Sequence, residues 1–196
     1  ALHGLEPGID LAARGTATIG GMVATNAGGI MAHRYGVMRH RVLGLEAVMP
    51  DGRIYSDMTR VVKNTAGYDL KHLFIGAEGT LGIVTRVVLK LEPVPRTTAT
   101  VLLGLPSVAA ALEAISLAMA ARTGHLRAAE GLWQSYIELT SAAQGWSEPG
   151  FALVHPVYLL VMLGGADQAG LDAEIERIFG EVLENHPSTN GIIDTS

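Results

Sequence analysis

The residue types best suited to chemistry gather near the amino end, in a stretch that carries no acidic side chain. Positions 11–45, a run of 35 residues, contain neither Asp nor Glu, although the whole chain has a formal net charge of -5. The same stretch contains four arginines and two histidines: Arg14, Arg34, Arg39, Arg41, His33 and His40. Because positive side chains without neighbouring carboxylates attract anions, the local charge of about +4 predicts an anion site.

Glycines and small polar residues of this stretch provide backbone donors for such an anion. Residues 16–21 read Thr-Ala-Thr-Ile-Gly-Gly, and residues 24–29 read Ala-Thr-Asn-Ala-Gly-Gly. Glycine has no Cβ, so its N–H group can turn toward phosphate oxygens and approach them closely. The pattern is neither a Walker loop nor a GxGxxG fingerprint. The competing interpretation is an irregular β domain whose glycine pairs mark tight turns.

A second glycine cluster at residues 76–82 reads Gly-Ala-Glu-Gly-Thr-Leu-Gly. Taken alone, it predicts a connection from a helix to a strand that needs positive φ at two or three positions. The segment that follows alternates apolar and polar residues. This pattern predicts a strand with one face made of Ile83, Thr85, Val87, Leu89 and Leu91.

The elements that must position these clusters are also indicated by the sequence. An Asp-Gly pair within residues 50–52 lies between apolar runs at 42–49 and 53–55, which predicts a β-hairpin. In the second half, Ser107 and Asp167 are suited to cap amphipathic helices. Strands are expected before these helices and as short return strands after them, at residues 99–105, 156–163, 128–132 and 191–193. Two such strand-helix units favour a ferredoxin-like α+β sheet.

Composition bounds the classes of protein that remain. With 196 residues, 48% of them hydrophobic, the chain is long enough for one large or two small domains, and we place the boundary near Pro93 and Pro95. The acidic balance argues against nucleic acid as a partner. The absence of cysteine excludes disulfides, thiolate metal sites and cysteine nucleophiles. No apolar run reaches the length of a membrane span, and the compartment we favour is the cytoplasm.

The two glycine clusters, in this order and about 50 residues apart, resemble the FAD-linked oxidases and dehydrogenases of the vanillyl-alcohol-oxidase type. The resemblance is to their D-2-hydroxy acid branch, which includes glycolate oxidase flavoprotein subunits, D-lactate dehydrogenases and D-2-hydroxyglutarate dehydrogenases. It rests on residues 15–29, 35–36, 42–46, 67–70 and 76–85, and covers most of residues 9–95. It implies an α+β chain: the C-terminal part of a PCMH-type FAD-binding domain (1–95), then part of a ferredoxin-like substrate or cap domain (96–196).

The resemblance also implies which residues contact the cofactor FAD. The first block is similar to the stretch that lines the flavin and its pyrophosphate, and the second to the segment that closes around the adenosine side. Carried over residue by residue, the implied FAD contacts are Thr16, Thr18, Ile19, Gly20, Gly21, Ala24, Thr25, Asn26, Gly28, Gly29, Glu78, Gly79, Ile83 and Val84.

The family pattern extends beyond both ends of this sequence. The chain begins with Ala1 rather than Met, and the resemblance implies a missing N-terminal subdomain with a further pyrophosphate loop. It also implies that a histidine-rich region beyond Ser196 supplies a divalent metal and the catalytic base. The seven histidines form no close pair, so no metal site is expected within these residues. We therefore expect a fragment that is not active alone.

In the full enzyme, the resemblance implies oxidation of glycolate, D-lactate or D-2-hydroxyglutarate to the 2-oxo acid, with hydride passing to flavin N5. Arg34 or Arg39 is a candidate for holding the substrate carboxylate. An electron-accepting protein or quinone, a homo-oligomer, and a cytoplasmic location or one peripheral to the inner face of a membrane are also expected. The alternatives are a non-catalytic module that binds FAD or an anion, and a structural fragment whose strand edges pair with a sister chain.

Overall fold

The computed structural model describes residues 3–195; Ala1, Leu2 and Ser196, which include the outer limits of both predicted domains, lie outside the described residues. Its internal contacts divide the chain into two compact units, one reaching Val94 and the other starting at Pro95. Within residues 3–195, no helix has the length and apolar character that crossing a membrane would require.

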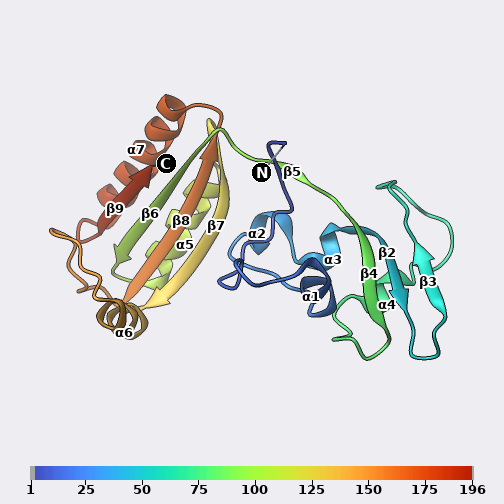
Figure 1. The fold of residues 1–196 in the computed structure, drawn as a ribbon. Coiled ribbons are helices and arrows are strands. Elements are labelled where there is room, and N and C mark those ends of the chain that lie inside the picture. Colours follow the sequence, from blue (N-terminus) through green and yellow to red (C-terminus); the bar gives the residue numbers. More distant parts are fainter. Residues whose placement is uncertain (1–2, 196) are drawn as a thin grey trace. The chain divides into compact units, whose positions relative to one another are not determined.

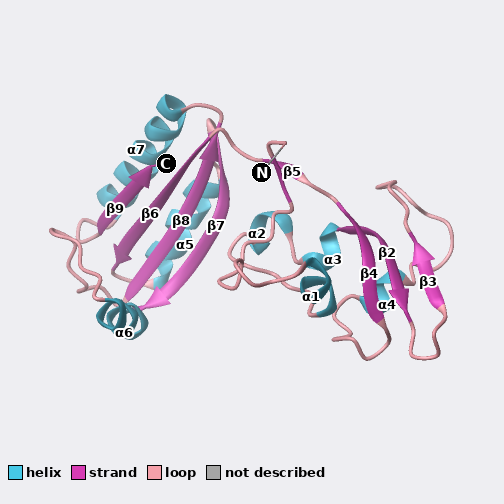
Figure 2. Cartoon of the chain, in the orientation of Figure 1, coloured by secondary structure: helices cyan, strands magenta, loops and turns pink. Residues whose placement is uncertain are grey.

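The N-terminal unit consists of two small sheets and short helices (Figures 1 and 2). Its elements are β1 (Leu5–Glu6), α1 (Ile19–Ala24), α2 (Ala32–Tyr35), α3 (Met38–Arg41), β2 (Val42–Val48), β3 (Ile54–Asp57), α4 (Lys71–Phe74), β4 (Ile83–Leu89) and β5 (Glu92–Pro93). Strand β1 pairs with β5, and a three-stranded antiparallel sheet has the order β3-β2-β4. Since these helices are short, packing and loop hydrogen bonds must stabilise the unit.

The predicted hairpin is confirmed. Strands β2 and β3 pair antiparallel, with Val48 opposite Ile54. Gly52 in the turn has φ +82°, a conformation that glycine adopts without a steric penalty. Its N–H group donates to the carbonyl of Met49 at 2.9 Å, which closes the turn.

Strand β4 forms as predicted, but the expected facing of its side chains is wrong. The register with β2 shifts between the pair Glu46–Arg86 and the pair Ala47–Val84, which leaves Thr85 as an extra residue. A bulge of this kind reverses the faces on either side of it. Val84 therefore packs against the core together with Val87 and Leu89, whereas Ile83 is 66% exposed, and Thr85 and Leu91 are exposed too.

The core of the N-terminal unit is made by side chains from several elements. Val23 of α1, Met38 of α3 and Leu45 of β2 are fully buried and belong to one cluster. Ile75, which follows α4, is buried in the same cluster. This small core fixes the end of α1 against the central strand of the sheet; Gly20 and Gly21 lie within that helix, and Gly28 and Gly29 follow it.

The C-terminal unit is a single four-stranded sheet with helices (Figure 1). Its elements are β6 (Thr97–Leu105), α5 (Val108–Met119), β7 (Gly124–Trp133), α6 (Gln134–Gln144), β8 (Val157–Gly165), α7 (Gln168–Asn185) and β9 (Asn190–Thr195). The antiparallel strand order is β7-β8-β6-β9. The two units β6-α5-β7 and β8-α7-β9 give the predicted ferredoxin-like arrangement, which is confirmed.

Both predicted capping residues are confirmed, because the Ser107 hydroxyl accepts from the N–H of Ala110 and the Asp167 carboxylate from that of Gly170. The two capped helices, α5 and α7, pack on one face of the sheet around a continuous apolar core. Helix α6 was not predicted. Its Ile137 packs with Phe151 and Tyr158 in a separate cluster, and the two buried residues of the helix are too few to produce a clear apolar stripe.

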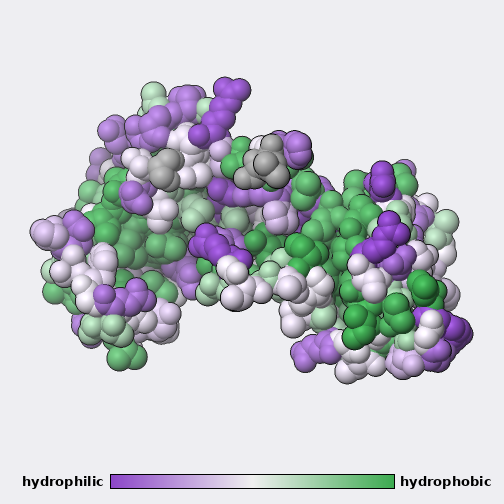
Figure 3. Space-filling view, in the orientation of Figure 1, coloured by the Kyte–Doolittle hydropathy of each residue, from purple (hydrophilic) through white to green (hydrophobic). Residues whose placement is uncertain are grey.

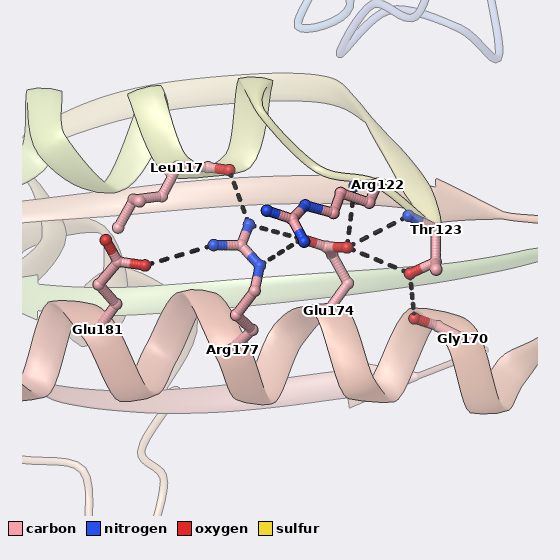
Figure 4. Close-up of polar contacts among 7 residues, drawn as sticks. All are labelled: Leu117, Arg122, Thr123, Gly170, Glu174, Arg177 and Glu181. Carbon is pink, nitrogen blue, oxygen red and sulfur yellow. Dashed lines mark hydrogen bonds and ion pairs between the residues drawn. The ribbon is translucent and has the colours of Figure 1, made fainter.

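A buried carboxylate links the turn before β7 to helix α7 (Figure 4). Glu174 is 4% exposed and accepts hydrogen bonds from the N–H groups of Arg122 and Thr123 and from the Arg177 guanidinium. Burial alone would raise the pKa of Glu174, but these hydrogen bonds and the Arg177 charge together lower it to about 2. The carboxylate is therefore ionised at neutral pH and holds the turn in place.

Candidate functional site

The first predicted block folds into α1 and the turns on either side of it. Thr18 caps the helix, and its hydroxyl accepts from the N–H of Gly21 at 3.1 Å. Thr25 ends the helix, with its hydroxyl donating to the carbonyl of Gly21 at 3.0 Å. Thr16 donates in the same way to the carbonyl of Ala13. The Thr16 and Thr25 hydroxyls thus have acceptors within the chain and stabilise the local fold.

The second predicted block lies directly against the first, although about 50 residues separate them. The N–H of Gly76 donates to the carbonyl of Val23 at 3.0 Å, and the N–H of Glu78 donates to that of Ala24 at 2.8 Å. Beyond this loop, β4 runs beside α1, since a Cβ added to Gly20 would lie 3.6 Å from the carbonyl oxygen of Val84. Residues 19–26 and 76–84 therefore form one contiguous surface of the N-terminal unit.

Two backbone outliers mark this surface. Among the described residues, Asn26 (φ +50°) and Glu78 (φ +52°) are the non-glycine residues with positive φ. Both belong to the predicted cofactor set, and they lie at the contact between the two blocks, where a Cβ added to Gly76 would lie 3.1 Å from the Cβ of Asn26. Strained conformations of this kind persist where surrounding contacts hold them, and they concentrate at ligand sites.

Several main-chain donors of the first block remain available to a ligand. Within residues 3–195, the N–H groups of Ile19, Gly20, Gly28 and Gly29 form no hydrogen bond to another part of the chain. No carboxylate belongs to residues 11–45, so these donors are in a stretch with positive side chains. This donor set is chemically suited to phosphate oxygens, and the residues present fit a dinucleotide with a pyrophosphate.

Gly29 has a second reason to be glycine. Its φ is +134°, and a Cβ at this position would lie 2.0 Å from the carbonyl oxygen of Asp10. The neighbouring N–H of Ile30 donates to the same oxygen at 3.1 Å. The close approach of the two chain segments therefore requires glycine here, whether or not a ligand is bound.

The surface also presents apolar side chains to a ligand. Ile19 is 43% and Ile83 66% exposed, and Gly79 and Glu78 are exposed beside them. Figure 3 shows hydrophobic surface over the sheet of the N-terminal unit. The planar ring of a dinucleotide could therefore pack on Ile19 and Ile83 while the main-chain donors bind the phosphates of the same ligand.

The two arginines predicted to hold a substrate carboxylate differ in their surroundings. Arg34 is exposed and its guanidinium lies 5.7 Å from the centre of the Tyr35 ring. Arg39 is partly buried, and its guanidinium donates to the carbonyls of His72 and Ile75. The guanidinium of Arg39 is thus used to join chain segments, and its role toward a carboxylate stays a prediction.

Asp69 and His72, which the sequence reasoning did not select, form a polar cluster with Arg39. The imidazole Nε2 of His72 lies 3.3 Å from the carboxylate of Asp69, and Nδ1 lies 3.4 Å from Nη1 of Arg39. The adjacent Tyr68 is 94% exposed and contributes nothing to this cluster. The only signal in the sequence was the position of Asp69 and His72 just before the second glycine cluster.

Other parts of the chain offer less chemistry. In the described part of the chain, no group of three or more His, Asp and Glu side chains is placed to hold a metal ion. Two cavities lie in the C-terminal unit. One is within its apolar core, and the other, lined by Leu102, Ile137 and Trp146 among others, lies beside α6. Neither is lined by a predicted cofactor residue.

Comparison with protein families gives two matches. Residues 1–57 match the model described as "FAD binding domain", and residues 94–195 match "FAD linked oxidases, C-terminal domain". The first match includes the acid-free stretch, and the second includes the whole ferredoxin-like sheet.

Curated relatives match along nearly the whole chain. D-2-hydroxyglutarate dehydrogenase, mitochondrial, from Bos taurus is 40% identical over 94% of this chain and 34% of its own length. D-2-hydroxyglutarate dehydrogenase from Xanthomonas citri pv. viticola is 37% identical over 99% of this chain and 40% of its own. D-lactate dehydrogenase from Archaeoglobus fulgidus is 35% identical over 92% of this chain and 40% of its own. The chain thus spans between a third and two fifths of these relatives.

A solved structure supports the fold. Alkyldihydroxyacetonephosphate synthase superposes with a TM-score of 0.69 at 22% identity, over 100% of this chain and 37% of the other. At this identity the similarity concerns the fold alone. The family match over residues 94–195, together with the FAD-binding match before it, confirms the resemblance found in the sequence: the chain belongs to the FAD-linked oxidases.

Proposed function

We propose that the surface formed by residues 19–26 and 76–84, together with the flanking residues 16–18 and 27–29, binds FAD. The proposal is carried by one observation: two segments about 50 residues apart meet through Gly76 and Glu78, and a strained residue lies on each side of the contact. The proposed contacts are Thr16, Thr18, Ile19, Gly20, Gly21, Ala24, Thr25, Asn26, Gly28, Gly29, Glu78, Gly79, Ile83 and Val84. Of these, the free N–H groups would donate to the pyrophosphate, and Ile19 and Ile83 would cover an aromatic ring.

The proposed reaction of the whole protein is oxidation of a D-2-hydroxy acid, such as D-2-hydroxyglutarate, D-lactate or glycolate, to the 2-oxo acid. The relatives named for the first two substrates support this proposal. When bound, FAD would supply the hydride acceptor at flavin N5 for the hydrogen on the substrate Cα. The hydroxyl proton passes to a base, so the substrate loses two electrons and two protons.

In this scheme the residues of this chain bind FAD and orient the substrate. Residues 1–95 would be part of the FAD-binding domain, and residues 96–196 part of the substrate or cap domain. Arg34 or Arg39 would fix the substrate carboxylate. We propose that the base, and a divalent metal if one takes part, come from the additional length that the curated relatives possess.

Electrons would pass from the reduced flavin to an acceptor protein or a quinone. A quinone acceptor suits a protein at the inner face of a membrane, and a protein acceptor suits a cytoplasmic one. A homo-oligomer is proposed as well. Sedimentation tests the oligomeric state, and cell fractionation tests the location.

The function is tested by adding FAD to the purified chain and removing unbound cofactor. Retained flavin absorbance supports the site, and a colourless protein contradicts it. Bleaching by D-2-hydroxyglutarate or D-lactate, with the L enantiomers as control, would show that the chain also supports catalysis. Bound flavin that is not bleached would instead identify this chain as an FAD-binding module.

A further inference from the structure

Arg39 connects the two blocks of the proposed cofactor surface through its main chain and its side chain. Its main-chain N–H donates to Oδ1 of Asn26 at 2.9 Å. Its guanidinium donates through Nη1 to the carbonyl of His72 at 2.8 Å and through Nη2 to that of Ile75. Ile75 precedes Gly76, whose N–H binds Val23. One residue thus holds the strained Asn26 and the start of the second block together.

His72 lies between this arginine and a carboxylate. Its Nδ1 is 3.4 Å from Nη1 of Arg39, and its Nε2 is 3.3 Å from Oδ2 of Asp69. Because a guanidinium can only donate, Nδ1 must be the acceptor, and the ring proton then belongs on Nε2, facing Asp69. The contacts therefore assign a neutral imidazole with the Nε2–H tautomer.

The charges around His72 favour this neutral form. Burial lowers the pKa of His72 below its ordinary value, Asp69 raises it, and Lys71, Arg39 and His40 lower it. Asp69 is shared, since its carboxylate also forms an ion pair with Lys71 at 2.5 Å. Tyr55 of β3 lies within electrostatic range of Asp69, and Asp57 lies within range of Tyr55. Protonation of His72 would therefore place a second positive charge beside Arg39, while the Asp69 carboxylate is already paired with Lys71.

We propose that His72 is a positioning residue for the cofactor surface, and that its protonation weakens flavin-nucleotide binding by loosening the clamp that Arg39 makes between Asn26 and Ile75. This inference rests on the proposed function of the same surface. The imidazole is 36% exposed, so protons reach it from water. A proton on Nδ1 would point at Nη1 of Arg39, where two donors and two positive charges would oppose each other.

The sign of the effect follows from linkage. If the cofactor binds best when His72 is neutral, proton binding competes with it, and affinity falls as the pH drops through the pKa of His72 in the free protein. A shift of about one pKa unit between the free and bound states corresponds to about a tenfold change in affinity. Because the pKa of His72 is lowered from its ordinary value, pH 5.5 captures only part of this change, and the FAD dissociation constant is predicted to be severalfold larger at pH 5.5 than at pH 8.

The test measures the ratio of these dissociation constants by flavin fluorescence quenching for the 196-residue chain and two variants. His72→Gln keeps an amide that can accept from Arg39 and donate to Asp69 but cannot be protonated, so its ratio should be near one. His3→Gln removes an exposed histidine of the same unit and should keep the ratio of the parent. An equal ratio in the parent and in His72→Gln would overturn the inference, even though FAD binds.

A second measurement needs no cofactor, so it separates the inference from the proposed function. The ¹⁵N shifts of the His72 ring, assigned by their loss in His72→Gln, should show the Nε2–H tautomer at pH 8. Observation of the Nδ1–H tautomer, or of a charged ring at that pH, would overturn the inference. Failure of the parent to bind FAD at either pH would instead contradict the proposed function.

Discussion

The two units of this chain achieve order by different means. In the C-terminal unit, strands of up to ten residues and two capped helices enclose a continuous apolar core. In the N-terminal unit, helices of four to six residues surround a small core, and main-chain hydrogen bonds join distant loops. The C-terminal unit is stabilised mainly by burial of regular faces, and the N-terminal unit depends more on particular polar contacts.

This difference separates a scaffold from a binding surface. Regular elements turn their N–H groups and carbonyls toward each other, which leaves few main-chain donors for a ligand. In the N-terminal unit, the first turn of α1 leaves the N–H groups of Ile19 and Gly20 available, and the loop after α1 leaves those of Gly28 and Gly29 available, within the described residues. Strained conformations at Asn26 and Glu78 accompany this arrangement. We therefore place the cofactor at the start of α1 and on the loops around it.

The largest effect is expected from a core truncation in the C-terminal unit. Leu171 of α7 is fully buried, and Leu171→Ala should lower the free energy of unfolding of this unit by about 2–5 kcal/mol through lost burial and the cavity left behind. Urea unfolding measures this. Leu139→Ala, at a leucine of the same unit that is 71% exposed, should change stability by about 0.5 kcal/mol at most. Equal effects of the two variants would contradict the burial account.

A somewhat smaller effect is expected at Glu174, the buried polar contact of the C-terminal unit. Its pKa of about 2, against 4.5 for an ordinary glutamate, corresponds to about 3 kcal/mol of stability at neutral pH. Because the folded-state pKa is the lower one, this stability is fully present well above pH 4.5. It is lost as the pH falls from there toward 2.

Chemical unfolding at several pH values tests this prediction. Glu174→Gln should be about 2–3 kcal/mol less stable than the parent at pH 7, and the difference should shrink toward pH 3. Glu176→Gln, at an exposed position of the same helix, serves as the matched control. A difference that does not depend on pH would show that the carboxylate charge is not what stabilises the turn.

The smallest stability effect concerns the polar clamp of the N-terminal unit. Arg39→Met removes the guanidinium bonds to the carbonyls of His72 and Ile75 and should cost about 1–2 kcal/mol. The cost should appear as faster hydrogen exchange at residues 23–26 and 75–78. Arg53→Met removes only an ion pair with Asp51 in which the arginine is 76% exposed, and should leave exchange there unchanged. Unchanged exchange in Arg39→Met would contradict the clamp.

The parts of the fold that could be predicted from sequence are those with a clear period or a strong local signal. The caps Ser107 and Asp167 with the apolar stripes after them predicted two helices, and the Asp-Gly turn at Gly52 between two apolar runs predicted a hairpin. Helix α6 was missed because only Ile137 and Ser141 of it are buried. The faces of β4 were wrong because a bulge at Thr85 has no reliable sequence signal.

The candidate site was predictable in composition but not in geometry. Acid-free, glycine-rich residues indicated an anion site, and the resemblance indicated which anion. The steric reason for Gly29 depends on Asp10, which lies close only in the folded chain. The contact of Arg39 with His72 joins residues 33 positions apart, and no local pattern encodes such a distance.

The central claim, that flavin nucleotide binds the surface carrying residues 19–26 and 76–84, is tested most directly by two matched substitutions. Ile83 and Ile54 are 66% and 65% exposed and lie opposite the same residue, Val48, on its two neighbouring strands. Only Ile83 belongs to the proposed site. The measurement is the FAD dissociation constant of the chain, of Ile83→Glu and of Ile54→Glu.

Ile83→Glu should weaken binding about tenfold or more, because it replaces an apolar contact with a negative charge beside an anionic ligand. Ile54→Glu should leave the dissociation constant within about twofold of the parent, since a substitution away from the site has little effect. Equal dissociation constants for the two variants, or no FAD binding by the parent chain, would contradict the account.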